Sequence, residues 1–339
     1  MRAAVFNKGG EPWTIETLED PVPGEGEAVI KVARNGICGT DVSFTSGNGY
    51  DFPESSVLGH EFAGEVVAIG KGVERLKLGD RVTSIPCSGC GHCAQCDLGH
   101  DTFCETSYPA SYMGGYGEYM KIAERATVRL PQSLSMADGA LVEPLAVGLH
   151  GVRLGGIGPG SRVLVLGAGS IGLATLFFAT QSGARVVAAS RSARRADMAL
   201  RLGAEAFVET GDGEAERIAD ALGGPPDVVF ECAGAVGLLQ QSINLVRPKG
   251  TVVSMGFCMQ PDPVIPGVST FREPVLKFSM ACTLDEFREV TTVLDAGHLE
   301  PRDMVTRVIG LDELPAMIEA MRTGVTETKV HVDPFMVTE

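Results

Sequence analysis

Residues 161–192 read SRVLVLGAGSIGLATLFFATQSGARVVAASRS, and their pattern decides the fold of the middle of the chain. An apolar run at 163–166 is typical of a buried strand, and the G-x-G-x-x-G pattern at 167–172 predicts a tight turn. Helical composition follows at 173–181, and a second apolar strand at 184–189. Such a unit favours a dinucleotide site over a plain glycine-rich turn of another α/β protein, because a pyrophosphate can approach the backbone at the helix N-terminus.

The same alternation continues further along the chain. PPDVVFECAG at 225–234 and GTVVSMGF at 250–257 each predict a buried strand, and a helical stretch ending in RPKG separates them. This order predicts an α/β fold with a doubly wound parallel sheet. The residues expected to contact the dinucleotide at the first turn are Gly167, Gly169, Ser170, Ile171 and Gly172.

The end of the second strand bears on the choice of cofactor. A unit specific for NAD places Asp or Glu there, about 20 residues beyond the glycines, to bind the ribose 2′-hydroxyl. Here the segment reads AASRSARR, with Ser190 in the place of the acid and Arg191, Arg194 and Arg195 close behind it. A 2′-phosphate would meet donors and positive charge, although a solvated basic helix start would read the same way. We expect NADP(H) to be preferred over NAD(H), with Ser190 and Arg191 as the main contacts and Arg195 beside them.

Composition and charge narrow the class of protein. A chain of 339 residues with 44% hydrophobic and 21% charged residues is long enough for two domains of a packed soluble protein. The N-terminal MRAAVF does not resemble a signal peptide, and no apolar stretch reaches the ~20 residues that span a bilayer. The formal net charge of −15 repels polyanions. We therefore expect a cytoplasmic protein with no nucleic-acid or membrane partner.

A dense cluster of cysteines lies between 87 and 104, where five of the nine in the chain occur. In a reducing compartment, such spacing favours metal binding over disulfides. Four of them form C-x2-C-x2-C-x7-C, namely Cys90, Cys93, Cys96 and Cys104. The pattern predicts one tetrahedral zinc ion, with an iron–sulfur cluster as the competing interpretation. A closed four-thiolate site leaves no position for substrate, so this lobe is expected to be structural, with Cys87 a bystander or an alternative ligand.

A second, mixed set of candidate ligands flanks the lobe. GICGTDVSF supplies Cys38, VLGHEFAGEVVAIG supplies His60 and Glu61, and LVEPLAVGLHG supplies Glu143. Each is weak by itself, because a lone cysteine is usually a small core residue and a lone glutamate usually lies on a solvated face. Together, however, a thiolate, an imidazole and a carboxylate suit a zinc ion that keeps one exchangeable position.

These motifs resemble, jointly and in order, the zinc-containing medium-chain dehydrogenase/reductase family across essentially the whole chain. The motifs are GICGTD, GHEFAGEV, GDRV, CGHCAQCDLGHDTFC, EPLAVGLHG, VLGAGSIG and FECAG. The resemblance implies a GroES-like β-barrel catalytic domain at 1–146 and 282–339, which carries the structural-zinc lobe at 87–104, and a Rossmann domain at 147–281. It also implies a homo-oligomer, a tetramer or a dimer, and two zinc ions per chain, one catalytic and one structural.

The resemblance also assigns roles to the residues around the mixed ligand set. Cys38, His60 and a glutamate would hold the catalytic zinc, with Glu61 either an exchangeable ligand or a carboxylate behind the ligands. Thr40 is similar to the hydroxyl that accepts the alcohol proton in the family. Ser43 occupies the position where many relatives have a histidine that helps to pass this proton outward.

Asp41 is expected to hold His60 in one tautomer, or else to cap a turn. Glu143 stands where relatives that metabolise simple alcohols often have a second cysteine, and EPLAVG is more like the polyol and threonine dehydrogenases.

The expected activity is reversible hydride transfer between a secondary alcohol or polyol and NADP, with a ketone as product. The zinc would lower the pKa of the alcohol and stabilise charge on its oxygen. Two alternatives remain at this stage. One is a carbonyl reductase acting on a bulkier ketone, and the other is a zinc-stabilised binding protein of the same fold that has lost turnover.

Overall fold

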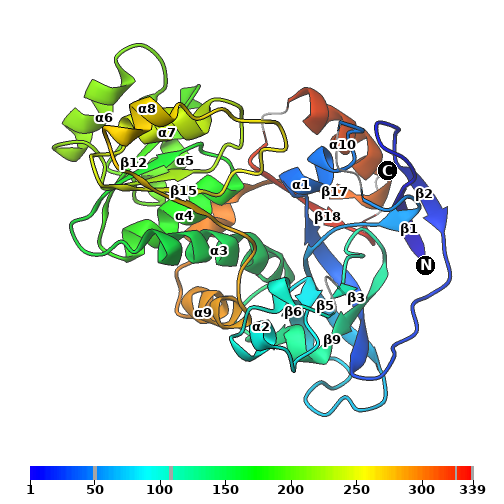
Figure 1. The fold of residues 1–339 in the computed structure, drawn as a ribbon. Coiled ribbons are helices and arrows are strands. Elements are labelled where there is room, and N and C mark those ends of the chain that lie inside the picture. The colour runs from blue at the N-terminus through cyan, green and yellow to red at the C-terminus, as the bar shows by residue number, and fades with distance from the viewer. Residues whose placement is uncertain (49–51, 107–109, 325–326, 337–339) are drawn as a thin grey trace. The chain divides into compact units, whose positions relative to one another are not determined.

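The computed structural model describes residues 1–48, 52–106, 110–324 and 327–336. The chain forms two compact units, one of Met1–Glu143 with Thr283–Glu339 and the other of Pro144–Cys282 (Figure 1). The expected boundaries lay at 146/147 and 281/282, within a few residues of these. The first change of unit falls inside helix α3 (Met136–Gly155), next to Pro144.

The first unit is built on strands, and its longer ones contain runs of consecutive buried residues, as in β1, β3 and β5. Its larger sheet has the order β10-β6-β5-β3-β18-β17, and β9 also pairs with β3. A smaller sheet has the order β2-β1-β4. The strands of these two sheets are β1 (Arg2–Phe6), β2 (Thr14–Thr17), β3 (Glu27–Gly36), β4 (Ser56–Val57), β5 (Glu61–Ile69), β6 (Arg81–Ser84), β9 (Tyr119–Ala123), β10 (Thr127–Arg129), β17 (Val305–Gly310) and β18 (Lys329–Asp333).

Helices and a small two-stranded sheet, β7 with β8, complete this unit. The remaining elements are α1 (Gly39–Ser43), β7 (Cys87–Ser88), α2 (Ala94–Asp97), β8 (Ala110–Ser111), α9 (Leu284–Asp295) and α10 (Leu314–Thr323). One apolar core, which includes Ile30, Phe62 and Ile122, fills the strongly curved sheet around β3 and β5. A second core contains Trp13, Tyr116 and Val332, so the two ends of this unit's chain share one apolar cluster.

The C-terminal strand β18 lies inside the larger sheet, between β3 and the last strand β17. It runs antiparallel to β3, with His331 opposite Gly36, and parallel to β17. A residue near position 330 is therefore placed beside the end of β3, some 290 positions away in the sequence. The pairing brings Lys329, the first residue of β18, to the end of β3.

The second unit confirms the predicted α/β fold with a parallel sheet. Its strands have the order β13-β12-β11-β14-β15-β16, and all pairs are parallel. They are β11 (Arg162–Leu166), β12 (Arg185–Ser190), β13 (Ala206–Glu209), β14 (Val228–Glu231), β15 (Thr251–Ser254) and β16 (Val275–Phe278). The helices are α4 (Ser170–Gln181), α5 (Ala196–Arg201), α6 (Glu214–Leu222), α7 (Leu238–Leu245) and α8 (Pro266–Thr270).

Both faces of this sheet are covered, as a parallel sheet requires. Leu164 and Leu166 of β11 pack with residues of α6 and α7 in one apolar cluster. Val163 and Val165 point to the opposite face and are equally buried there. The helix after the glycine turn begins at Ser170, three residues earlier than composition predicted, because the last part of the motif forms the first helical turn. Within the described ranges, no helix is long and apolar enough to cross a membrane.

Candidate functional site

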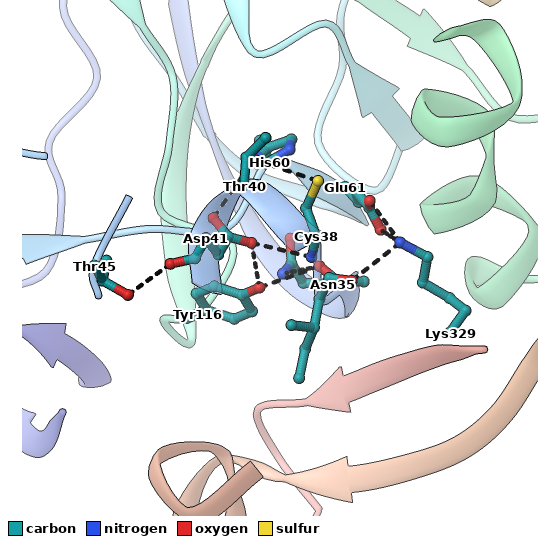
Figure 2. Close-up of polar contacts among 11 residues, drawn as sticks. Asn35, Cys38, Thr40, Asp41, Thr45, His60, Glu61, Tyr116 and Lys329 are labelled. Carbon is teal, nitrogen blue, oxygen red and sulfur yellow. Dashed lines mark hydrogen bonds and ion pairs between the residues drawn. The ribbon is translucent and has the colours of Figure 1, made fainter. Parts of the chain in front are cut away.

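Strands β3 and β5 bring two of the predicted ligands together. They pair antiparallel with Gly36 opposite Glu61, so the residues just beyond these ends are neighbours. Cys38 follows β3 as the N-cap of α1, and His60 directly precedes β5. One ligand atom each from Cys38, His60 and Glu61 lies within 4.8 Å of the others. The local sequence thus builds a thiol–imidazole–carboxylate cluster at the point where two paired strands end (Figure 2).

Asp41 lies next to this cluster and faces both His60 and the backbone of Cys38 (Figure 2). Its Oδ1 is 3.5 Å from His60 Nδ1, and its Oδ2 accepts a hydrogen bond from the Cys38 backbone N–H at 3.2 Å. Burial opposes a charged imidazole, yet Asp41 and Cys38 raise the pKa of His60 well above its ordinary value. The cluster therefore carries a field that favours a cation at this point. Asp41 therefore caps the turn at Cys38, and its 3.5 Å approach to His60 leaves the control of the histidine tautomer a prediction.

Glu61 is held by a lysine that the sequence analysis did not single out. Lys329 Nζ donates to both carboxylate oxygens of Glu61 at 2.6 Å and to the Ile37 carbonyl at 3.0 Å (Figure 2). The side chains are 1% and 0% exposed. Gly36 leaves the space that the carboxylate occupies, since a Cβ there would lie 2.0 Å from Glu61 Oε2. A bidentate, fully buried ion pair therefore borders the candidate metal ligands.

Glu143 lies close to the same cluster but outside the group of three. It is buried on α3, and burial, together with Glu61 and Asp41, raises the pKa of its carboxyl to about 7 despite the opposing influence of His60 and Lys329. The protonation of the Glu143 carboxyl therefore depends on the charges of the cluster. Of the two glutamates left open by the sequence, Glu61 has the carboxylate that lies within 4.8 Å of the cysteine and histidine ligand atoms.

The two hydroxyl residues predicted for proton transfer occupy different environments. Thr40 Oγ1 donates to Cys38 Sγ at 3.2 Å, so this hydroxyl lies directly at the ligand cluster. Ser43, one helical turn later at the end of α1, has an exposed side chain. The structure thus brings Thr40 to the site and leaves Ser43 facing outward.

The four lobe cysteines form a second compact group. The Sγ atoms of Cys90, Cys93, Cys96 and Cys104 all lie within 4.8 Å of one another, and all nine cysteines of the chain are free thiols. A side chain at Gly89 would come within 2.3 Å of Cys96 Sγ, so the close approach requires glycine. Cys87 lies outside this group. Burial raises the pKa of its thiol, which also responds to the charges of His60 and Glu143.

Both groups fit zinc in the chemistry of their donors. Four thiols at mutual contact distance match a closed tetrahedral site, and a thiol, an imidazole and a carboxylate match a site with one open position. The buried and otherwise unpartnered Nδ1 of His60 is consistent with a ring that is oriented toward a cation by Asp41.

The glycine turn of the second unit has the geometry that a phosphate site needs. Gly167 has φ +103°, which favours glycine, and a Cβ at Gly172 would lie 1.8 Å from the Gly167 carbonyl oxygen. A Cβ at Gly169 would meet no protein atom within 4 Å. The protein's own packing and backbone conformation therefore require the first and third glycines. The space beside Gly169 can accept a pyrophosphate, and the amides of Ser170 and Ile171 at the start of α4 can donate to it.

The predicted 2′-phosphate contacts lie at and after the end of β12. Ser190 is its last residue and is half-buried, Arg191 is exposed, and burial lowers the pKa of Arg195, which is also near Arg194. One carboxylate lies nearby, because Glu209 of β13 is paired with Ser190 in register. Its Oε1 accepts a hydrogen bond from the Ala193 N–H at 3.1 Å and so serves to hold this loop.

Comparison with known proteins agrees with this architecture. Residues 24–132 match the alcohol dehydrogenase GroES-like domain, and residues 170–296 match the zinc-binding dehydrogenase domain. The chain is 34% identical over 299 residues to L-galactonate-5-dehydrogenase of Escherichia coli (strain K12), which covers 85% of this chain and 86% of that protein. It is 35% identical over 273 residues to sorbitol dehydrogenase of Gallus gallus, covering 75% and 74%.

A solved structure extends the similarity over nearly the full length. It is a Sinorhizobium meliloti 1021 protein described as a zinc-binding dehydrogenase and bound to NADP, with a TM-score of 0.88, 34% identity and coverage of 98% of this chain and 99% of that one. The chain belongs to the zinc-containing medium-chain dehydrogenase/reductase family. It is a dehydrogenase that acts on CH–OH groups.

Two residues that shape the site were missed by sequence reasoning, namely Lys329 and Tyr116. Lys329 lies in the strand-like segment KVHVD, where a lysine among apolar residues could have signalled a buried partner. Tyr116 lies in GGYGEY, where the flanking glycines could have signalled a tightly packed aromatic ring. Neither signal identifies the residue that the side chain contacts, because Glu61 and Asp41 lie far from Lys329 and Tyr116 in the sequence.

Proposed function

We propose that the protein oxidises a secondary alcohol, such as one carbon of a polyol or a sugar acid, to a ketone with NADP as hydride acceptor. The observation that carries the proposal is the grouping of Cys38, His60 and Glu61 ligand atoms within 4.8 Å of one another, beside a hydroxyl on Thr40. The names of the relatives that act on L-galactonate and sorbitol support polyhydroxylated substrates.

The ligand set would be Cys38, His60 and a glutamate. Glu61 has its carboxylate within 4.8 Å of the other two ligand atoms, and Glu143 lies outside that group but responds to its charges. When bound, zinc would supply a Lewis acid that polarises the substrate oxygen. Thr40 would relay the proton of the substrate hydroxyl, accepting it at Oγ1 while its own hydroxyl proton passes on to the cofactor ribose or water. The 3.2 Å between Thr40 Oγ1 and Cys38 Sγ supports this role. A second zinc would be held by the four lobe cysteines, where it stabilises the fold.

The preference for NADP rests on the end of β12. Ser190 offers a hydroxyl where an acid would repel a 2′-phosphate, and Arg191 offers an exposed guanidinium next to it. The NADP found in the Sinorhizobium meliloti relative supports the same choice. We expect kcat/KM to be higher with NADP than with NAD, and Arg191→Ala to reduce that ratio. A ratio that favours NAD in the parent enzyme would contradict the preference.

The reaction itself is tested by following the absorbance of reduced nicotinamide across a panel of polyols, sugar acids and simple secondary alcohols. His60→Ala should abolish turnover while the protein stays folded, whereas His298→Ala, a histidine exposed on the surface of the same unit, should retain the parent rate. Normal turnover in His60→Ala, or no turnover of any panel member by the zinc-loaded parent, would contradict the proposal.

We also expect a homo-oligomer, because strand β16 ends the described sheet with an exposed apolar edge. Val275, Leu276 and Phe278 are 48%, 36% and 70% exposed, and the nearby Phe271 is 90% exposed. An open strand edge of this composition is a template for pairing with another chain. A second copy of this chain is the proposed occupant. Sedimentation should show a dimer or tetramer in the parent and a smaller species in Phe278→Glu, and a monomeric parent would contradict this.

A reducing, cytoplasmic location completes the proposal. It is supported by the free state of all nine cysteines, eight of which lie outside the candidate catalytic cluster. Both proposed zinc sites depend on reduced thiols. Cell fractionation with an antibody to the chain would test this location directly.

A further inference from the structure

A buried tyrosine joins the two segments that carry the candidate catalytic ligands. Tyr116 is 0% exposed, and its hydroxyl donates to Asp41 Oδ2 at 2.6 Å (Figure 2). Asp41 in turn faces His60 through its other oxygen, with 3.5 Å between Oδ1 and Nδ1. The hydroxyl therefore acts on the histidine only through the carboxylate between them.

The backbone of Tyr116 is tied to the other ligand segment. Its N–H donates to the Leu58 carbonyl at 3.0 Å, two residues before His60, and its carbonyl accepts from the Ala4 N–H at 2.9 Å. The N–H groups of Gly114 and Gly115 both donate to the Gly59 carbonyl, at 3.2 and 3.0 Å. Tyr116 is thus anchored beside the chain that leads to His60, while its side chain reaches the helix that follows Cys38.

The ring itself is rigidly packed. It lies in the apolar core of this unit and makes an edge-on contact with Trp13, with ring centroids 5.6 Å apart. Burial, together with the charges of Asp41, Glu61 and Cys38, raises the pKa of Tyr116 well above its ordinary value, so the hydroxyl remains a donor. The hydroxyl also lies 3.3 Å from the Gly36 carbonyl, but its much shorter hydrogen bond, at 2.6 Å, goes to Asp41 Oδ2. Asp41 thus turns Oδ2 toward Tyr116 and the Cys38 N–H, and Oδ1 toward the imidazole.

We infer that Tyr116 is a positioning residue for the catalytic metal site, which it serves by orienting Asp41 toward His60. The inference rests on the proposed function, in that it requires zinc at Cys38 and His60. Partners behind a metal-bound histidine fix its tautomer and ring orientation, and their loss commonly weakens metal binding about 10–100-fold. Tyr116→Phe keeps the ring, its packing and its backbone bonds, and removes the hydroxyl alone.

Zinc release to a chromophoric chelator, from protein loaded with zinc at both sites, measures the effect. We expect Tyr116→Phe to weaken zinc binding about 10–100-fold at the catalytic site. The zinc of the four lobe cysteines, which form a separate group of ligands, should be released as in the parent and serves as an internal control. Tyr112→Phe is the matched control variant, because Tyr112 donates to Glu27 at 3.1 Å, away from the ligands.

A double-mutant cycle separates positioning from general stabilisation. If Tyr116 acts through Asp41, then Tyr116→Phe should weaken zinc binding only slightly further in a protein that already carries Asp41→Asn. Unchanged zinc release in Tyr116→Phe, additive effects in the cycle, or a Tyr116→Phe protein that fails to fold would each overturn the inference and leave the proposed function standing. A parent that retains only the lobe zinc would overturn both.

Discussion

Replacing Lys329 with methionine removes an ammonium group that neutralises a fully buried carboxylate. Lys329 Nζ lies 2.6 Å from each oxygen of Glu61, and the two side chains are 1% and 0% exposed. Burial opposes the charged lysine, but Glu61 and Cys38 raise the pKa of Lys329, so the lysine is charged at neutral pH. Methionine has a similar length and can fill the space, so the change tests charge rather than packing.

The expected loss is large because the partner cannot reach water. Removing one member of a buried ion pair costs about 3–5 kcal/mol, mostly as the penalty of the uncompensated charge that remains. The lost hydrogen bond to the Ile37 carbonyl, at 3.0 Å, adds to this penalty. We therefore expect Lys329→Met to lower the free energy of unfolding by about 3–5 kcal/mol.

Urea unfolding of protein whose catalytic site is free of zinc measures this quantity, with Glu61→Gln and the double variant completing a cycle. The double variant should be more stable than Lys329→Met alone, since neither buried charge remains. Lys8→Met is the matched control, because Lys8 forms an exposed pair with Glu11, at 3.5 Å with 63% and 56% exposure, and should have little effect.

Two results would refute this reasoning. One is a Lys329→Met protein that unfolds within about 1 kcal/mol of the parent, the range of an exposed pair. The other is a double variant whose loss in free energy of unfolding equals the sum of the losses in the two single variants, because additivity would mean that the two groups do not interact.

Three further predictions follow from separate parts of the first unit. Cys93→Ser should reduce the zinc content from two ions to one and lower the free energy of unfolding by on the order of 3 kcal/mol or more, as elemental analysis and urea unfolding would show. His331 is neutral in the folded state, because burial first and neighbouring positive charges second lower its pKa to about 3 from 6.5. The unfolded chain therefore binds an extra proton as the pH falls below about 6.5, so the free energy of unfolding decreases toward acid. Between pH 7 and pH 4, His331→Leu should lose up to about 3 kcal/mol less of this free energy than the parent. An equal loss in both proteins would contradict this prediction. Thr40→Ala should reduce kcat about 10²-fold with zinc retained, and Ser43→Ala much less, whereas a larger defect in Ser43→Ala would show that the two hydroxyls are assigned in the wrong order.

Features set by short stretches of sequence could be predicted well. The strand–turn–helix unit at 163–190 follows from a period of buried residues and from glycines whose conformations no other residue tolerates, and the α/β fold was confirmed. The four-cysteine group was found because its ligands lie within 15 residues of one another, so that spacing alone limits their geometry.

The mixed ligand set was only partly predictable. Cys38 and His60 lie 22 positions apart, and the sequence suggested them as a pair because of their residue types and motif resemblance. Nothing in the motifs distinguished Glu61 from Glu143, since both are glutamates beside the site. The register of β3 against β5 makes the difference, because it sets Glu61 opposite Gly36 and within 4.8 Å of the other ligand atoms.

The sequence by itself thus determined the family, the glycine turn and the residue types that can hold two metal ions, because each depends on local periodicity or close spacing. Only the tertiary structure decided which distant groups surround them. Strand β18 delivers Lys329 to Glu61 across 268 positions, and Tyr116 reaches Asp41 across 75. Side-chain partners of this kind depend on strand order and on which face each residue takes, and neither is encoded in the neighbouring residues.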